Sequence, residues 1–189
     1  MTNQLRVTLE IGPKGKKVVA VAPDWPGLER GAKTEAEVMT RLESYLPRYA
    51  QVAKLTGMDK AFAAITTLDM VEHYQGVGST DFWGISFAFS SFDRLSLSSA
   101  ELERELTLMQ AAWTFFDAVR SRVSAEMQKG ARGGGRDRDQ IVRHTLATEQ
   151  DWAKKLGLHT LDGTTLTDAV LLRAHRDAHC NAIRAFHAE

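Results

Sequence analysis

The chain has 189 residues with 43% hydrophobic and 25% charged content, ordinary values for a globular protein of one or two domains. Its 24 Lys and Arg residues balance 24 Asp and Glu residues. A non-specific nucleic-acid binder needs a basic excess or a strongly basic face, so this balance argues against that class. The chain has one cysteine, no apolar run of membrane-spanning length and a polar start, Met1–Arg6. We therefore expect a cytoplasmic protein.

The N-terminal residues have the pattern of short strands. Apolar and polar residues alternate over residues 7–11, which is the period of a half-buried strand. A turn at 12–15 and an apolar run at 17–22 complete a predicted hairpin. The prolines of residues 23–27 end its second strand because proline cannot donate to a β-ladder. A short third strand is predicted over 28–32.

A helix is predicted after these strands. Thr34 and Glu37 have the spacing of a capping box, and apolar residues then recur every three or four positions to about Leu55. Pro47 lies inside this pattern and should kink or divide the helix. A further strand is predicted over residues 69–76.

The remaining residues are predicted to form a connection and then helices. Residues 76–92 have no clear period, and we expect them to lay their aromatic side chains against a following domain. From Ser98 to about residue 127 the apolar positions repeat as in a bundle helix. Asp137 and Gln140 form a second capping box that opens a helix to residue 156. Thr165 or Thr167 caps a last helix.

The predicted fold class is α+β. A small β-hairpin/sheet-plus-helix domain at residues 1–76 is followed by a linker at 77–97 and an antiparallel helical bundle at 98–189. The amphipathic pattern stops abruptly at Glu189. We therefore expect that a final helix lies beyond this residue, or that a second subunit completes the bundle.

Three histidines nominate a metal site. His175 and His179 share the apolar face of the last predicted helix, and antiparallel packing would place His144 level with a point between them. Three imidazoles in one layer can form an open metal site, and they favour zinc or nickel over magnesium. His144 flanks the apolar stripe of its helix, whereas Glu149 lies nearer the centre. The alternative is a polar network that only holds the helices together.

The first 60 residues resemble the HicB family. The resemblance lies in the turn Asp24-Trp25-Pro26-Gly27, in Gly31, and in Thr34-Glu35-Ala36-Glu37 at the start of a helix. Antitoxins of that family bind a small toxin through this domain and usually carry a separate DNA-binding segment, which this sequence lacks. The resemblance implies a protein partner for the N-terminal domain.

The residues from about Ser98 onward resemble the DinB-like superfamily of four-helix bundles. The resemblance lies in Asp139-Gln140-Ile141-Val142-Arg143-His144, followed by Glu149 and Trp152. Metal-binding members place one histidine on the second helix and a His-x-x-x-His pair on the last. His144 matches the first position, and His175 and His179 match the pair, although they lie on the third predicted helix.

Two functional hypotheses follow. In the first, His144, His175 and His179 hold a divalent cation, zinc or nickel, and Glu149 orients a ligand or acts as a base. The DinB-like resemblance then implies a metal-dependent hydrolase or thiol transferase. In the alternative, the chain is a non-catalytic binding or regulatory protein. Its N-terminal sheet edge recruits a protein partner by strand addition, and its bundle forms a homodimer.

Overall fold

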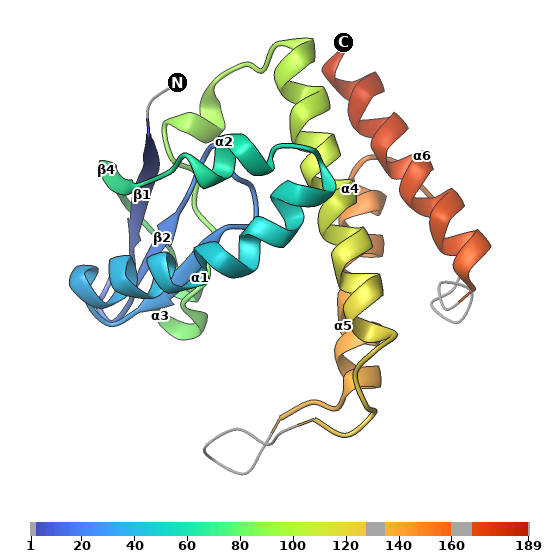
Figure 1. Ribbon diagram of the computed structural model, residues 1–189, viewed down its shortest axis with the longest axis horizontal. Coiled ribbons are helices and arrows are strands. Elements are labelled where there is room, and N and C mark those ends of the chain that lie inside the picture. The colour runs from blue at the N-terminus through green and yellow to red at the C-terminus, as the bar shows by residue number, and fades with distance from the viewer. Residues whose placement is uncertain (1–2, 128–134, 160–167, 189) are drawn as a thin grey trace. The chain divides into compact units, whose positions relative to one another are not determined.

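The computed structural model describes residues 3–127, 135–159 and 168–188. The chain divides into two compact units, Met1–Phe115 and Phe116–Glu189, and each is described by itself. The first unit holds a mixed four-stranded sheet with helices, and the second holds helices (Figure 1). The predicted α+β class is confirmed. The division falls inside a helix, later than the predicted start of the helical domain at residue 98.

The sheet is built from four strands in the order β3-β2-β1-β4. β1 (Gln4–Ile11) pairs antiparallel with β2 (Val18–Val21), which pairs antiparallel with β3 (Glu29–Ala32). These pairings confirm the predicted hairpin and third strand. β4 (Thr67–Gln75) runs parallel to β1, with a register shift that leaves Val71 as an extra residue.

Helix α1 (Glu35–Leu55) begins as predicted, because the Oγ1 of Thr34 accepts the backbone N–H of Glu37 at 3.2 Å. Pro47 lies inside α1, and the helix continues through it. The predicted division is therefore wrong. Burial of four α1 side chains in the core outweighs the hydrogen bond that proline removes; they are Val38, Leu42, Tyr49 and Val52. A short helix, α2 (Asp59–Ala63), follows.

The core of the first unit lies between one face of the sheet and its helices. Leu5, Val7 and Leu9 alternate along β1 and are fully buried in it. Thr8 and Glu10, on the opposite face of β1, are equally buried. The prediction of a half-buried strand is therefore wrong, because both faces are covered.

The second face is covered by the segment after β4. This segment consists of α3 (Gly78–Trp83), the loop 84–91 and a short 3-10 turn, η1 (Phe92–Arg94). We call residues 84–91 the covering loop, since their contacts with Glu10 lie on that face. The aromatic side chains of the segment were expected to pack on a following domain. Instead they are largely exposed, with exposed fractions between 51% and 69% for Phe82, Trp83, Phe87 and Phe89.

The second unit contains the end of α4 (Ser99–Arg120) together with α5 (Arg138–Lys155) and α6 (Ala169–His187). α4 ends earlier than the predicted residue 127. The capping box of Asp137 and Gln140 is confirmed. Asp168 caps α6; the predicted caps Thr165 and Thr167 lie outside the described residues, as does Glu189. Within the described parts of the chain, every helix is too short or too polar to cross a membrane.

Candidate functional site

The buried face of α6 carries polar side chains. Leu172, Arg176, His179 and Cys180 are buried, at the spacing i, i+4, i+7 and i+8 of a core-facing helix stripe. The helical periodicity of about 100° per residue predicts Arg176 mostly on the outer face of this helix, and that prediction is wrong. Arg176 is only 7% exposed, and its guanidinium has two carboxylate partners inside the second unit.

Glu149 and Asp117 form a network with Arg176. The Nε and Nη2 atoms of Arg176 each donate to one oxygen of Glu149 at 2.9 Å, and Nη1 donates to Asp117 at 2.7 Å. Burial alone would lower the pKa of Arg176, but the hydrogen bonds and charges of its two partners raise it. The cation that a buried Glu149 requires is therefore an arginine. Both carboxylate oxygens of Glu149 are occupied, which competes with the predicted role as a base.

His175 and His179 lie one turn apart, with their ring centroids separated by 6.3 Å. Burial lowers the pKa of both imidazoles, so both favour the neutral form that can bind a metal. The buried Nε2 of His175 has no hydrogen-bond partner among the described residues. This atom is a candidate ligand for a cation.

His144, on α5, does not face the interior with His175 and His179 of α6. The buried residues of α5 are Leu146, Glu149, Gln150 and Ala153, whereas His144 is exposed. At about 100° per residue, His144 lies roughly opposite Ala153 on the helix. Among the residues that the structure describes, no three or more His, Cys, Asp or Glu side chains group in a way that could hold a metal ion.

The first unit offers a second candidate site at an edge of its sheet. β4 has nine residues, and its described pairing is with β1 alone. The backbone N–H of Gly76, directly after β4, donates to the carbonyl of Ile11 in β1 at 2.8 Å. Because N–H groups alternate in direction along a strand, those of His73 and Gln75 face away from β1. Met70 and Val71 are 44% and 39% exposed.

The opposite edge, at β3, is partly covered. A Cβ atom at Gly31 would lie 2.1 Å from the carbonyl oxygen of Gly84, so the two backbones approach closely there. Arg41 of α1 donates to the carbonyl of Gly31 at 2.5 Å. These contacts leave β4 as the more accessible edge.

Three carboxylates hold the segment after β4 to the sheet. Buried Glu10 accepts hydrogen bonds from Ser86 Oγ at 2.7 Å and from the backbone N–H groups of Phe87 and Ala88 at 3.1 Å. Glu72 accepts both the backbone N–H and the Oγ of Ser91, at 3.0 and 2.6 Å. Sequence reasoning missed Glu10 because an alternating polar residue normally faces solvent.

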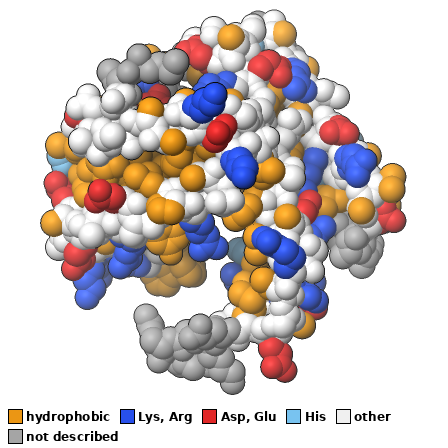
Figure 2. Space-filling view, in the orientation of Figure 1, with side chains coloured by type: hydrophobic (Ala, Val, Ile, Leu, Met, Phe, Trp, Pro, Cys, Tyr) orange, Lys and Arg blue, Asp and Glu red, His pale blue; other side chains and the backbone are white. Residues whose placement is uncertain are grey.

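Asp81 is the third of these carboxylates. It accepts backbone N–H groups from Lys14 at 2.7 Å and Lys16 at 2.8 Å, in the turn between β1 and β2. Desolvation by itself would raise the pKa of Asp81, but these hydrogen bonds lower it. The segment after β4 is thus held in place, and its aromatic side chains are exposed. Figure 2 shows that hydrophobic side chains reach the surface of the protein in groups.

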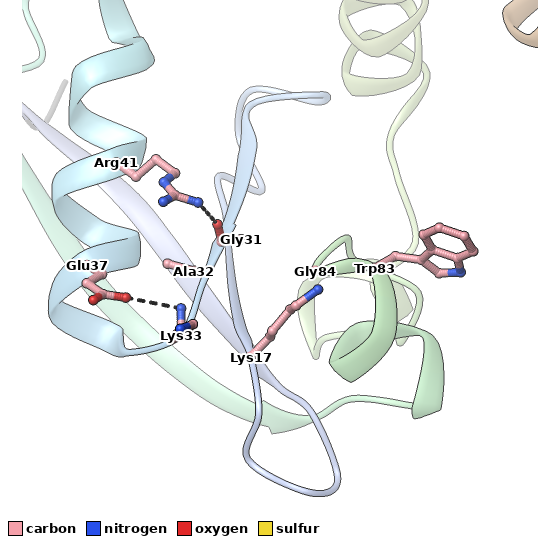
Figure 3. A pocket seen from close by; sticks show the side chains of 8 residues that line it. All are labelled: Lys17, Gly31, Ala32, Lys33, Glu37, Arg41, Trp83 and Gly84. Carbon is pink, nitrogen blue, oxygen red and sulfur yellow. Dashed lines mark hydrogen bonds between the residues drawn. The ribbon is translucent and has the colours of Figure 1, made fainter. Parts of the chain in front are cut away.

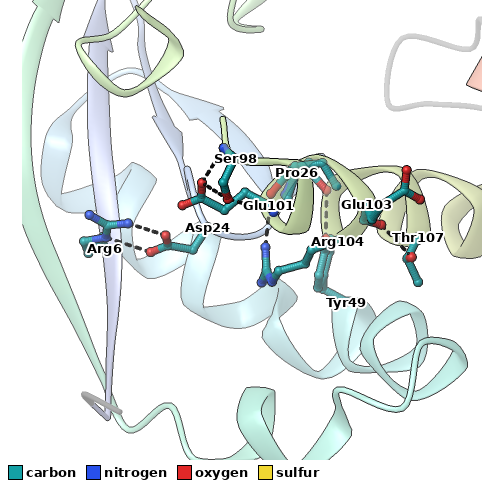
Figure 4. A network of polar contacts seen from close by, with 10 residues as sticks. Arg6, Asp24, Pro26, Tyr49, Ser98, Glu101, Glu103, Arg104 and Thr107 are labelled. Carbon is teal, nitrogen blue, oxygen red and sulfur yellow. Dashed lines mark hydrogen bonds and ion pairs between the residues drawn. The ribbon is translucent and has the colours of Figure 1, made fainter. Parts of the chain in front are cut away.

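The turn at Asp24-Trp25-Pro26-Gly27 is a structural anchor. Trp25 is 7% exposed and makes edge contacts with Tyr49 and Phe62. Asp24 pairs with Arg6, and the hydroxyl of Tyr49 donates to the carbonyl of Pro26 at 2.8 Å (Figure 4). These contacts fill the space around Trp25, so the turn closes the core.

Comparisons with protein-family models, with curated proteins and with solved structures found no match to this chain. The HicB-like and DinB-like resemblances therefore stay predictions.

Proposed function

We propose that this chain is a non-catalytic binding protein whose first unit recruits a protein partner by strand addition. The observation that supports the proposal is the outer edge of β4, which pairs with no other described strand. The opposite edge is hindered at Gly31 by Gly84 and Arg41. An extended peptide segment would add to β4 through main-chain hydrogen bonds.

The extra residue at Val71 limits where a partner can pair. A bulge interrupts the ladder and increases the local twist, which is a common protection of edge strands. A continuous register is therefore available on either side of Val71. The stretch from Glu72 to Gln75 has the outward N–H groups of His73 and Gln75.

Side chains near β4 would supply specificity. Glu72 bonds to Ser91, so the covering loop lies beside the strand on that face. Phe87 and Phe89 of this loop are 51% and 69% exposed. A partner segment with apolar side chains at alternate positions would contact them, because alternate residues of a strand face the same side.

The test uses two substitutions at Gln75. Gln75→Pro removes the outward N–H, a change that an edge strand tolerates, and Gln75→Ala keeps that N–H as the matched control. We expect a partner retained by the wild-type protein to be retained by Gln75→Ala and lost by Gln75→Pro. Amide hydrogen exchange at His73 and Gln75 should slow in the complex. Equal retention by a folded Gln75→Pro variant would contradict strand addition, and failure to retain any protein would contradict a recruiting function.

A second candidate function is divalent metal binding at His175 and His179, and it is favoured by the buried, unpartnered Nε2 of His175. Zinc or nickel suits imidazole ligands. His144 would join only after a rearrangement, and Glu149 only by leaving Arg176. Metal analysis of protein purified without a histidine tag is the test. Metal that is lost in His175→Ala and retained in His73→Ala would support this function and reopen the hydrolase or thiol-transferase hypothesis.

We also propose that the helices of the second unit form an antiparallel bundle that dimerises. Val170 and Phe186, near opposite ends of α6, are 75% and 70% exposed, so two large apolar side chains of α6 meet solvent. A second copy of the chain would cover them. Light scattering should show a dimer that Phe186→Glu dissociates, and a monomeric wild-type protein would contradict this part of the proposal.

A further inference from the structure

A pocket of about 410 Å³ lies at the β3 edge of the first unit (Figure 3). Gly31 and Ala32 of β3 form one part of its wall, and the first turns of α1 form another. Gly84, whose carbonyl approaches Gly31, closes the side toward α3. The pocket is separate from the edge at β4, because β3 and β4 form the two opposite edges of the sheet.

The charged side chains that line this pocket are mostly cationic. Lys17, Lys33 and Arg41 contribute three positive charges, and Glu37 contributes one negative charge. None of the three cations has a carboxylate within ion-pair distance in the part of the chain that the structure describes. The lining therefore has an excess of two positive charges.

Two of the cations are positioned by backbone carbonyls. The Nζ of Lys17 donates to the backbone carbonyl of Phe82 at 2.6 Å, and the Nη1 of Arg41 donates to the backbone carbonyl of Gly31 at 2.5 Å. An ammonium has three N–H donors and a guanidinium has five, so both groups retain donors for a ligand. Glu37 is turned toward the backbone N–H of Lys33, which its Oε2 accepts at 3.2 Å. One carboxylate oxygen of Glu37 is thus already occupied by a hydrogen bond.

The same arrangement disfavours other ligand classes. The positive excess repels a cation, and the lining offers few apolar side chains to an uncharged ligand. The ring of Trp83 points away from the pocket (Figure 3), so it provides no stacking surface there. The pocket lies beside the N-terminal end of α1, where the helix dipole adds further positive potential.

We propose that this pocket binds a phosphate dianion, either as a free phosphate or as a phosphoryl group on a protein side chain. The two negative charges match the excess of two positive charges. Lys and Arg are the side chains that bind phosphate oxygens most strongly.

The test is a titration of the full chain with inorganic phosphate at constant ionic strength. Backbone amide chemical shifts of Gly31 and Gly84 report binding at this pocket. Lys33→Gln removes a charge whose side chain makes no hydrogen bond in the described structure, and it should weaken binding roughly three- to tenfold. Glu37→Gln keeps an oxygen that can accept the N–H of Lys33, and it should strengthen binding by a similar factor. Lys54→Gln, at the far end of α1, is the charge-matched control and should have no effect.

Arg41→Gln should also weaken binding, but it removes the hydrogen bond to Gly31 and therefore changes the wall of the pocket as well. The proposal is therefore judged on Lys33→Gln and Glu37→Gln. A phosphoserine peptide that binds more tightly than inorganic phosphate would identify a protein-borne phosphoryl group as the source; the reverse ranking would identify a free phosphate. Absence of saturable binding of both probes would overturn the proposal. Equal affinities of the wild-type, Lys33→Gln and Glu37→Gln proteins would overturn it as well.

Discussion

At the scale of single residues, the stability of the second unit depends on the pairing of buried Arg176 with Glu149 and Asp117. A buried ion pair stabilises little compared with apolar packing, but a buried charge that loses its partner is costly. Arg176→Leu should therefore lower the free energy of unfolding by about 3–5 kcal/mol, because the buried Glu149 loses its cation, whereas Asp117 still pairs with Arg120. The double variant Arg176→Leu/Glu149→Leu should recover much of that loss. Urea denaturation followed by circular dichroism measures both, and equal losses in the two variants would contradict this account.

The histidine pair makes the stability of the second unit depend on pH. Burial lowers the pKa of His175 and His179 below the ordinary value of 6.5. Unfolded chains then take up protons near pH 6.5 while the folded protein resists them, so stability is complete above that pH and is lost as the pH falls. Glu149 opposes this shift, and the positive charge of Arg176 reinforces it at His175.

The double variant His175→Gln/His179→Gln isolates this effect. When the pH is lowered from about 7.5 to about 5.5, the urea concentration at the unfolding midpoint of the wild-type protein should decrease. The midpoint of the variant should decrease less. A control variant, His73→Gln, alters an imidazole of the first unit that is paired with Glu35. If the wild-type and double-variant midpoints decline in parallel, the histidine pair is not the cause.

At the scale of elements, Glu10 determines where the covering loop lies. A carboxylate is an acceptor at both oxygens, whereas an amide presents an NH2 group to the donors of Ser86, Phe87 and Ala88. Glu10→Gln should therefore destabilise the first unit by about 2–3 kcal/mol. Amide exchange of Phe87 and Ala88 should accelerate, while the core of α1 stays protected. Unchanged exchange at these two amides would show that other contacts hold the loop.

The elements that were predictable from the sequence are those with local signals. Thr34 and Asp137 cap helices at the expected positions, and the turn glycines and prolines delimit the first three strands. The covering loop was not predictable in this way, because it has no period and is positioned by carboxylates far away in the sequence. Arg176 could have been found from its place on the buried stripe of α6, since a buried arginine there requires a carboxylate such as Glu149. Its second partner, Asp117, comes from α4 and leaves no local signal.

At the scale of the whole molecule, α4 belongs to both units. Its first part contributes Leu108 and Ala111 to the core of the first unit, and Arg104 stacks over the ring of Trp25 at 4.9 Å. The sequence predicted a boundary at residue 98 because the apolar period changes there. A change of period marks a change of secondary structure, whereas a domain boundary depends on which side chains pack together. Here the first part of α4 joins the core of the unit that precedes it.

This difference predicts how fragments of the chain behave. Residues 1–115 contain the whole first core and should fold alone with a cooperative thermal transition. Residues 1–97 lack Leu108, and truncation of one buried leucine already costs on the order of 3 kcal/mol, a large share of the net stability of a small domain. They also lack Ala111 and Arg104, so Trp25 should become exposed and the transition broad or absent. Circular dichroism and tryptophan emission follow both fragments. If residues 1–97 melted at the same temperature as residues 1–115, the packing of α4 would be dispensable and the boundary at 98 would be the better description.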